Sequence, residues 1–221
     1  VVLLDDTATG STAVNLSTAV NPGAVTVNNT SKAYSIGGAS LSGSGPLIKF
    51  GTETLTITGT HSFSGGTSVS AGTLRFGNGS LDGVIGGAVI NNGAIVLNAT
   101  GSVSSTMSIS GAGTLTKSGA GNYALSSAAT YTGATVVSAG TLRVPALASS
   151  SISTASGATL EFNRIAAGTL DPSSATITGA GAVAYTGPAV LLSGVGDFSL
   201  NDSNTYSGGT SISNARTQMQ N

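Results

Sequence analysis

Side chains that could do acid–base or metal chemistry are few in this sequence and far apart. The carboxylates are Asp5, Asp6, Glu53, Asp82, Glu161, Asp171, Asp197 and Asp202. Glycoside hydrolysis needs two acids that converge on one bond, and only Asp5 with Asp6, and Asp197 with Asp202, are close in sequence. Adjacent strand residues face opposite sides, which separates Asp5 from Asp6. This leaves Asp197 and Asp202 as weak candidates for a calcium site or a ligand loop. The simpler interpretation is that both are solvated turn residues.

Histidine and cysteine offer no stronger site. His61 is the only histidine in the sequence, and cysteine is absent. A metal site or a general base built on His61 would need further ligands or an orienting partner, so we expect His61 to lie in an exposed turn. The absence of cysteine excludes disulfides and thiolate metal sites. We predict no catalytic residue, no cofactor and no metal beyond the weak candidates above.

Three Gly-x-Gly segments, at residues 43–45, 111–113 and 179–181, have the composition of phosphate-binding loops. None leads into a helix that begins with Lys and Ser or Thr, as a phosphate loop would. The same element also occurs three times, which favours structural turns.

A run of alternating threonines at residues 52–58 has the residue type of an ice-binding face. Such a face needs a flat threonine array that repeats from strand to strand. The residues 68 positions after Thr54 and Thr56 are Asn122 and Ala124. We therefore expect the array not to continue.

Composition limits the range of partners. Charged residues make up 7% of the chain and the formal net charge is −1, with no cluster of Lys and Arg, which argues against a nucleic-acid partner. No apolar run reaches the roughly 18–20 residues of a transmembrane helix, so we expect no membrane insertion by this segment. The N-terminal VVLLDDTATG lacks the basic region of a signal peptide. We read the chain as an excerpt or a processed fragment.

An internal repeat organises the sequence. The stretch FSGGTSVSAGTLRF at residues 63–76 recurs as YTGATVVSAGTLRV at residues 131–144, 68 positions later, and YSGGTSISNA begins a third copy at Tyr206. Because a repeat fixes the architecture before single residues are interpreted, we predict one β-solenoid segment over residues 1–221. Its units are expected at about residues 22–90, 91–155 and 156–214, with a divergent tail at 215–221.

Alternation of apolar and polar residues predicts short strands throughout, whereas helical spacing is nearly absent. Each 68-residue unit contains three strand clusters, which predicts a parallel β-solenoid with about 22–23 residues per rung and three rungs per repeat. The third copy carries extra residues near 185–199, where we expect an outward loop. The competing fold is an antiparallel sandwich with Asn-Gly turns, which gives no reason for the long repeat.

The repeat also predicts which side chains face inward. We expect Val69, Val137 and Ile212, which share one repeat position, to stack as one apolar ladder. We expect the aromatic repeat position to form a packing ladder rather than a sugar-binding platform. Arg75 and Arg143 follow inward leucines and should face solvent. The residues that define the repeat are Phe63, Gly65, Gly66, Val69, Gly72, Leu74, Tyr131, Gly133, Val137, Gly140, Leu142, Tyr206, Gly208, Gly209 and Ile212.

The motif resembles the autotransporter-associated β-strand repeat, also called the passenger-associated transport repeat. Two near-complete copies at equal spacing carry the resemblance, and the third breaks at Asn214, where Ala-Gly-Thr-Leu is expected. The resemblance implies a right-handed parallel β-helix in a secreted bacterial passenger, located outside the cell or on its outer surface. It implies display and secretion rather than one defined ligand.

These observations favour a structural or adhesive extracellular solenoid that contacts an unidentified surface or glycan. The alternatives are a carbohydrate-active or carbohydrate-binding β-helix and, third, an ice-binding solenoid. The open rung at the C-terminal end lacks backbone partners. We therefore expect residues 215–221 to fray or to fold across it, and we keep end-to-end assembly into a filament as a hypothesis.

Overall fold

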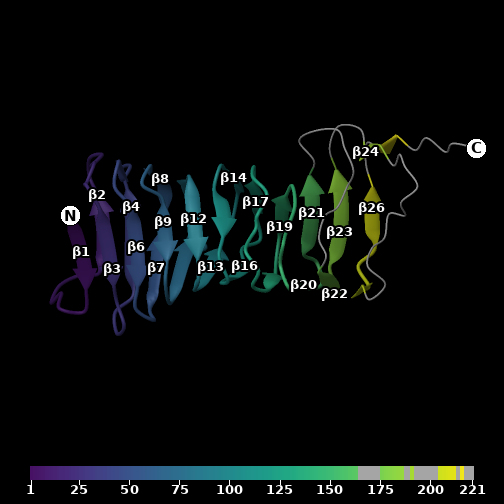
Figure 1. Ribbon diagram of the computed structural model, residues 1–221, viewed down its shortest axis with the longest axis horizontal. Coiled ribbons are helices and arrows are strands. Elements are labelled where there is room, and N and C mark those ends of the chain that lie inside the picture. The colour runs from purple at the N-terminus through teal and green to yellow at the C-terminus, as the bar shows by residue number, and fades with distance from the viewer. Residues whose placement is uncertain (164–174, 187–189, 192–203, 213–214, 217–221) are drawn as a thin grey trace, which may run out of the picture.

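The computed structural model describes residues 1–163, 175–186, 190–191, 204–212 and 215–216. In these residues the chain consists of short strands and turns, without a helix. The strands stack side by side along one axis in chain order, from the N-terminus to the C-terminal part (Figure 1). All paired strands are parallel, as a β-solenoid requires.

Each turn of the coil contributes strands to up to three faces. The first face contains β1 (Val2–Asp5), β3 (Val25–Asn28), β6 (Leu47–Phe50), β9 (Thr67–Val69), β12 (Ala88–Asn91) and β15 (Ser108–Ser110). The second face is the longest, with β2 (Ala13–Leu16), β4 (Tyr34–Gly38), β7 (Thr54–Ile57), β10 (Thr73–Phe76), β13 (Ala94–Leu97), β16 (Thr114–Lys117), β18 (Thr135–Val137), β20 (Ser151–Thr154), β22 (Thr176–Gly179) and β25 (Thr205–Tyr206).

The third face is divided into two sheets. The first contains β5 (Ser42–Gly43), β8 (Gly59–Phe63) and β11 (Gly83–Gly86). The second contains β14 (Ser102–Ser105), β17 (Asn122–Leu125), β19 (Thr141–Val144), β21 (Thr159–Asn163), β23 (Ala182–Thr186) and β26 (Thr210–Ile212). A separate pair joins β24 (Val190–Leu191) to β27 (Ala215–Arg216). Residues 215 and 216 of the expected tail are thus paired, and residues 217–221 lie outside the described part.

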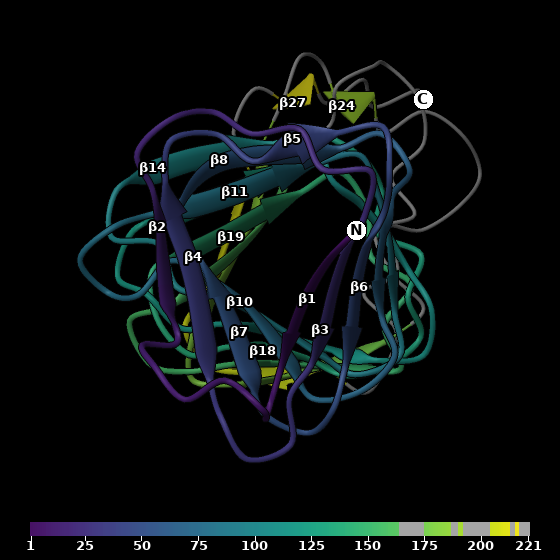
Figure 2. The same cartoon turned by 90° about the vertical axis from the view of Figure 1, so that its left-hand side faces the viewer.

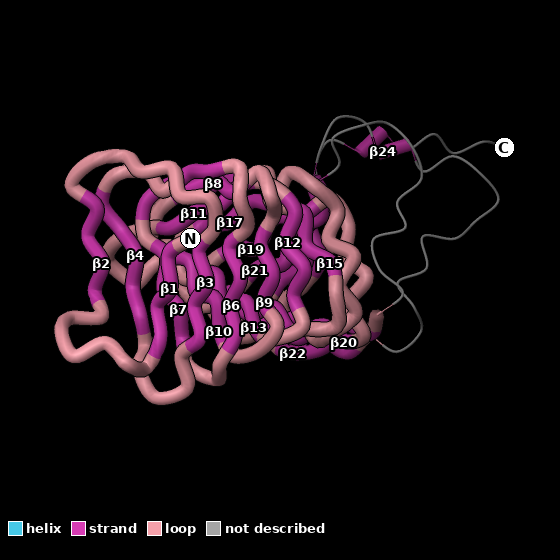
Figure 3. Tube along the Cα trace, turned by 60° about the vertical axis from the view of Figure 1, so that its left-hand side comes forward, coloured by secondary structure: helices cyan, strands magenta, loops and turns pink. Residues whose placement is uncertain are grey.

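The coil is right-handed. Viewed from the N-terminal end in Figure 2, the chain passes from β4 on one side over β5 to β6 on the other side, and then returns below to β7 while receding from the viewer. Loops lie at the corners between the faces, and the strands run across the faces (Figure 3). The predicted all-β parallel solenoid is therefore confirmed, and the antiparallel sandwich is wrong.

The central turns of the coil are shorter than the 22–23 residues that the sequence predicted, whereas the first turns, from Val2 to Val25 and from Val25 to Leu47, have the predicted length. Along the second face, Leu55, Leu74, Ile95, Leu115 and Thr135 are successive register partners, so the residue number rises by 19, 21, 20 and 20 from one turn to the next. A 68-residue repeat therefore advances about three and a third turns, not three. Corners of two or three residues between the first and second faces, such as 70–72 and 92–93, help to keep these turns short.

This extra third of a turn moves each repeat copy to a different face. Val69 lies in β9 on the first face, Val137 in β18 on the second, and Ile212 belongs to β26 on the third. The expected single ladder of these three residues is therefore wrong. Val69 and Val137 are fully buried, as alternation predicts, but each stacks on residues from other parts of the repeat.

The core is one continuous apolar column inside the coil. Leucine, isoleucine, valine and aromatic side chains from all three faces fill it, and most are fully buried. Burial of this kind is the main favourable term in folding. The repeating turn thus specifies a rod with an apolar interior and three outer faces.

Candidate functional site

The carboxylates of Asp6 and Asp82 bind loops of the neighbouring turn. Asp6 accepts hydrogen bonds from the amides of Thr30, at 2.9 Å, and of two following residues. The hydroxyl and amide of Thr30 hold the pKa of Asp6 well below its usual range. Asp82 accepts from the amide of Thr100 at 2.7 Å and from that of Gly101 at 3.2 Å. These acids connect corners rather than form a catalytic pair.

The remaining acids are also dispersed. Glu161 makes an ion pair with Arg143, with 2.9 Å between Nε and Oε2, and Asp5 binds the amide of Thr7 at 3.0 Å. Within the described ranges, no three acids or histidines come together as a metal site would require. The candidates Asp197 and Asp202, together with Asp171 and most of the expected loop at residues 185–199, lie outside the described residues.

His61 is buried in β8, not exposed in a turn, so that expectation was wrong. The amide of Leu41 donates to Nδ1 at 2.9 Å, and Nε2 donates to the carbonyl of Thr58 at 2.8 Å. Because Nδ1 accepts a hydrogen bond, the ring is neutral. Burial lowers its pKa, partly opposed by the bond to Thr58. Alternation could have identified this position, because His61 lies two residues before the inward Phe63.

The aromatic repeat position takes part in hydrogen bonds, buried in the second copy and exposed in the third. The hydroxyl of Tyr131 lies 2.5 Å from Oγ1 of Thr135, four residues later, and Tyr206 contacts Thr210 in the same way at 2.5 Å. In the first copy the aromatic is Phe63, and Oγ1 of Thr67 is buried without a partner among the described residues. Phe63 in β8 and Tyr131, which lies outside the strands beside β15, both pack inward but do not form the expected single ladder.

Two buried lysines were missed by the sequence reasoning. Lys49 and Lys117 occupy equivalent positions in the first two repeat copies, and both are fully buried. The ammonium of Lys49 donates to the carbonyls of Phe50, Gly51 (2.8 Å) and Ala71 (3.4 Å). That of Lys117 donates to Gly119 and, at 3.2 Å, to Ala139.

Each lysine thus connects its own corner to the corner one turn later. Burial lowers the pKa of both lysines to about 8. Their recurrence at the repeat distance, at a position that alternation places inward, was the available signal.

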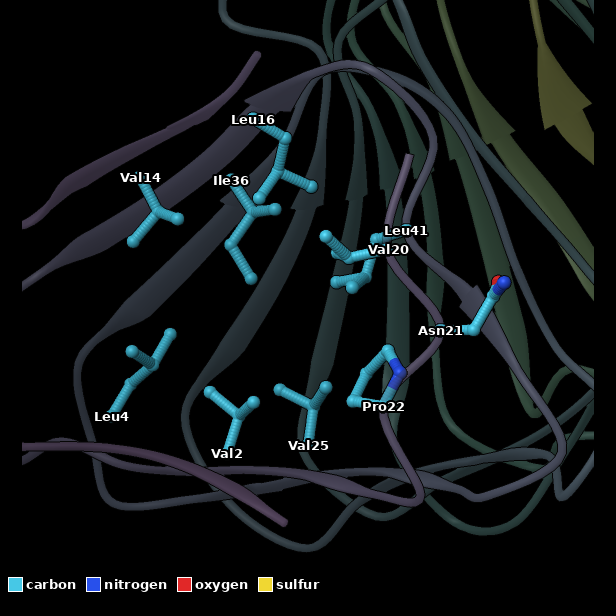
Figure 4. Close-up of a pocket in the computed structure, with 10 residues that line it drawn as sticks. All are labelled: Val2, Leu4, Val14, Leu16, Val20, Asn21, Pro22, Val25, Ile36 and Leu41. Atoms are coloured by element: carbon cyan, nitrogen blue, oxygen red, sulfur yellow. The ribbon is translucent and has the colours of Figure 1, made fainter. Parts of the chain in front are cut away.

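An apolar cavity of about 460 Å³ lies at the N-terminal end of the coil. The inward side chains of β1 and β2 surround it together with residues of the next turn (Figure 4). A second, more polar crevice of about 280 Å³ lies between β11 and β14, where the third face is interrupted. Asp82 and Thr60 border it, but Asp82 is already bound to the loop at Thr100.

The outer side of the second face carries two columns of small side chains, which we call the hydroxyl face. One column contains Thr54, Thr73, Ala94 and Thr114, with Ser151 and Thr176 further along. The other contains Ser35, Thr56, Arg75, Val96, Thr116, Val136, Ser153, Thr178 and Thr205.

The expectation that the threonine array of residues 52–58 does not continue was drawn from the wrong neighbours, although Arg75, Ala94 and Val96 do interrupt the array. It compared Thr54 and Thr56 with the equivalent positions of the next repeat copy, which lie on the third face. Their true neighbours on the next strand are Thr73 and Arg75. The one-third turn of each repeat explains the error.

Comparisons with known proteins agree with this architecture. The Passenger-associated-transport-repeat family model matches residues 47–76, 115–144 and 192–216. The sequence is 55% identical over 82 residues to "Adhesin BmaC autotransporter" of Brucella suis biovar 1 (strain 1330), and the match spans 37% of this chain and 2% of that protein. No solved structure matches the chain significantly.

Three segments of the chain therefore match the passenger-associated transport repeat, as the motif predicts. The chain is similar to a short stretch of a much longer autotransporter protein. Its location is accordingly extracellular or on the outer cell surface. Among the described residues, no helix is long and apolar enough to cross a membrane.

The first two matched segments explain the motif in physical terms. Each begins two residues before a buried lysine and includes the Ser-Ala-Gly corner one turn later, so Lys49 contacts Ala71 and Lys117 contacts Ala139 inside a single match. The glycine after each alanine, Gly72 in the first copy, has a positive φ and needs no side chain there. The motif is a structural unit of the coil.

Proposed function

We propose that this chain is an adhesive, non-enzymatic segment of an autotransporter-type passenger. The observation that carries the proposal is the continuous right-handed coil built from passenger-associated transport repeats. A rigid rod with a filled apolar interior leaves its outer faces free to contact a surface. The adhesin name of the Brucella relative supports this interpretation for the matched 82 residues.

Beads coated with the purified chain test adhesion directly. We expect them to attach to epithelial monolayers or extracellular matrix more than albumin-coated beads do, and soluble chain should compete. Attachment no greater than that of albumin beads would contradict the adhesive role.

The non-enzymatic part of the proposal rests on the use of the described acids as loop caps and ion-pair partners. Incubation with neutral glycans and polyuronates should therefore release no product. Reproducible turnover that is lost on Asp82→Asn, Asp197→Asn or Asp202→Asn would support a carbohydrate-active enzyme instead.

End-to-end assembly is a further proposal. The strands β1 and β2 are the first in their sheets, so one edge of each has free backbone groups, and the apolar cavity lies between them. Such an edge is a template for another strand, and a head-to-tail contact would form a filament. In sedimentation velocity, the sedimentation coefficient should increase with protein concentration, whereas a monomer at all concentrations would exclude assembly.

The division into units at residues 22–90, 91–155 and 156–214 also remains a proposal.

A further inference from the structure

The hydroxyl face differs chemically from the rest of the rod. Of its fifteen outward positions, eight are threonine and three are serine; Ala94, Val96 and Val136 are apolar, and Arg75 is the one charged residue. None of the fifteen is aromatic or acidic. The face therefore presents methyl and hydroxyl groups at regular spacing, with almost no charge.

Its hydroxyls are available to an external partner. Among the described residues, the hydroxyls of Thr54, Thr56, Thr73, Thr114 and Thr116 make no hydrogen bond with the protein. Strands lie about 4.8 Å apart along the rod, and alternate residues about 6.7 Å apart across it. These free donors and acceptors lie on β7, β10 and β16, with the apolar pair Ala94 and Val96 on the intervening strand β13.

Within the described part of the chain, Arg75 has no partner on this face. Its register neighbours are Thr56 and Val96, and its Nε is buried without a hydrogen bond. The equivalent residue in the next repeat copy, Arg143, lies beside Glu161 on the third face and forms the 2.9 Å ion pair. Among the described residues, the guanidinium of Arg75 thus makes no hydrogen bond or ion pair, and because its Nε is buried, only its terminal Nη groups are left to meet an external partner.

This chemistry restricts the partner. A polyanion would need a row of cations, and a single arginine does not supply it. An apolar surface would bury the hydroxyls without hydrogen bonds, at a cost for each group. An extended polymer that carries many hydroxyls and no charge meets both conditions, and one pyranose unit has about the length of one strand spacing.

We propose that the hydroxyl face binds an extended, uncharged polysaccharide laid along the rod, with Arg75 donating to its oxygens. The proposal rests on the adhesive function above and names the surface and ligand class for it. Because no aromatic platform is present among the fifteen residues, the sugars contact the face through their hydroxyl edges rather than by ring stacking.

Affinity electrophoresis of the purified chain tests the proposal with three soluble probes: hydroxyethyl cellulose, yeast mannan and polygalacturonate. At least one neutral probe should retard the chain. Thr116→Glu and Arg75→Gln should each raise the dissociation constant at least about tenfold, or about 1.4 kcal/mol. Ser104→Glu is the matched control, since Ser104 is exposed and outward on the third face. Equal melting temperatures will show that the variants fold.

Several results would overturn the proposal. They are no retardation by either neutral probe, equal weakening by Ser104→Glu, or retardation by polygalacturonate alone that salt abolishes. Thermal hysteresis without polysaccharide binding would assign the face to ice instead. Bead attachment that persists in Thr116→Glu while neutral probes fail would remove this inference and leave the adhesive function standing.

Discussion

Buried polar side chains in this coil mostly bind the backbone of the same or the neighbouring turn. His61 accepts a hydrogen bond from the amide of Leu41. Asn91 donates to the carbonyl of Thr114 at 2.9 Å, and Ser105 donates to the carbonyl of Ile85 at 2.8 Å. A buried polar group without a partner costs free energy. At the residue scale, the sequence therefore places polar groups where the ladder of backbone bonds is interrupted.

Phe63→Tyr should stabilise the chain. The new hydroxyl would reach the unpartnered Oγ1 of Thr67, as Tyr131 reaches Thr135 in the second copy. One hydrogen bond contributes about 0.5–1.5 kcal/mol, which urea unfolding can measure. Tyr131→Phe is the reciprocal control and should destabilise by a similar amount. A destabilised Phe63→Tyr would show that the space around Phe63 has no room for the hydroxyl.

His61 should make stability depend on pH below neutrality. Burial lowers its pKa in the folded state, so the unfolded chain, with a pKa near 6.5, binds the proton more readily. Stability is then complete above about pH 6.5 and falls as pH decreases below it. The melting temperature of the native chain should drop between pH 7.5 and 5 by more than that of His61→Gln. Parallel curves for the two proteins would contradict the neutral, buried ring.

The corner is the element that makes the turn regular. The corner between the first and second faces carries at least one glycine in each of five successive turns, among them Gly51, Gly72, Gly93, Gly113 and Gly133. A Cβ on each of the last four would meet the backbone of the preceding one. The buried lysines then connect corners of successive turns through carbonyl groups. Close backbone contact and the lysine bonds together hold neighbouring turns at one spacing.

Gly113→Ala should be strongly destabilising. Its Cβ would lie 2.3 Å from the carbonyl oxygen of Gly93, which cannot move without shifting the adjacent strand. Overpacking of this kind typically costs about 1–3 kcal/mol. Gly23→Ala is the control, because a Cβ there meets nothing within 4 Å. Urea unfolding with equal midpoints for both variants would contradict the corner packing.

Because of the buried lysines, the free energy of unfolding should increase as the pH rises above about 8. Their pKa is about 8 in the folded chain and about 10.4 in an unfolded one, so the unfolded chain binds more protons between these values. Stability therefore increases from about pH 8 toward pH 10. The melting temperature of the native chain should rise over this interval. In Lys49→Met/Lys117→Met the rise should be smaller, and an unchanged rise would show that these lysines are not its source.

At the scale of the whole molecule, most of the fold could be predicted from the sequence. Alternation identified inward residues such as Val137 and Leu142, and the motif indicated parallel coils. The length of the turn could not be read from the repeat, because the strand clusters of a repeat do not say how many complete turns they make. The register of Leu55, Leu74 and Ile95 fixes that length.

The length of the turn also decided which features of the candidate site could be predicted from the sequence. The hydroxyl face joins residues such as Thr56 and Thr116 that occupy unrelated positions in the repeat, so comparing repeat copies could not bring them together. The same holds for Lys49 and Ala71, whose contact depends on the length of the turn between them. The sequence pattern determined which side a residue faces, whereas turn length determined its neighbours.

Engineered cysteine pairs test the turn length most directly, because the chain has no cysteine of its own. Ala94 and Thr114 are outward register partners on adjacent strands, about 4.8 Å from each other and within disulfide range. Thr116 lies two positions further along the strand, at roughly 8 Å from Ala94, and would be its partner only in a turn two positions longer. Oxidation should cross-link Ala94→Cys/Thr114→Cys and not Ala94→Cys/Thr116→Cys, as mass spectrometry can show. Cross-linking of the second pair alone would contradict the short turn and, with it, the hydroxyl face.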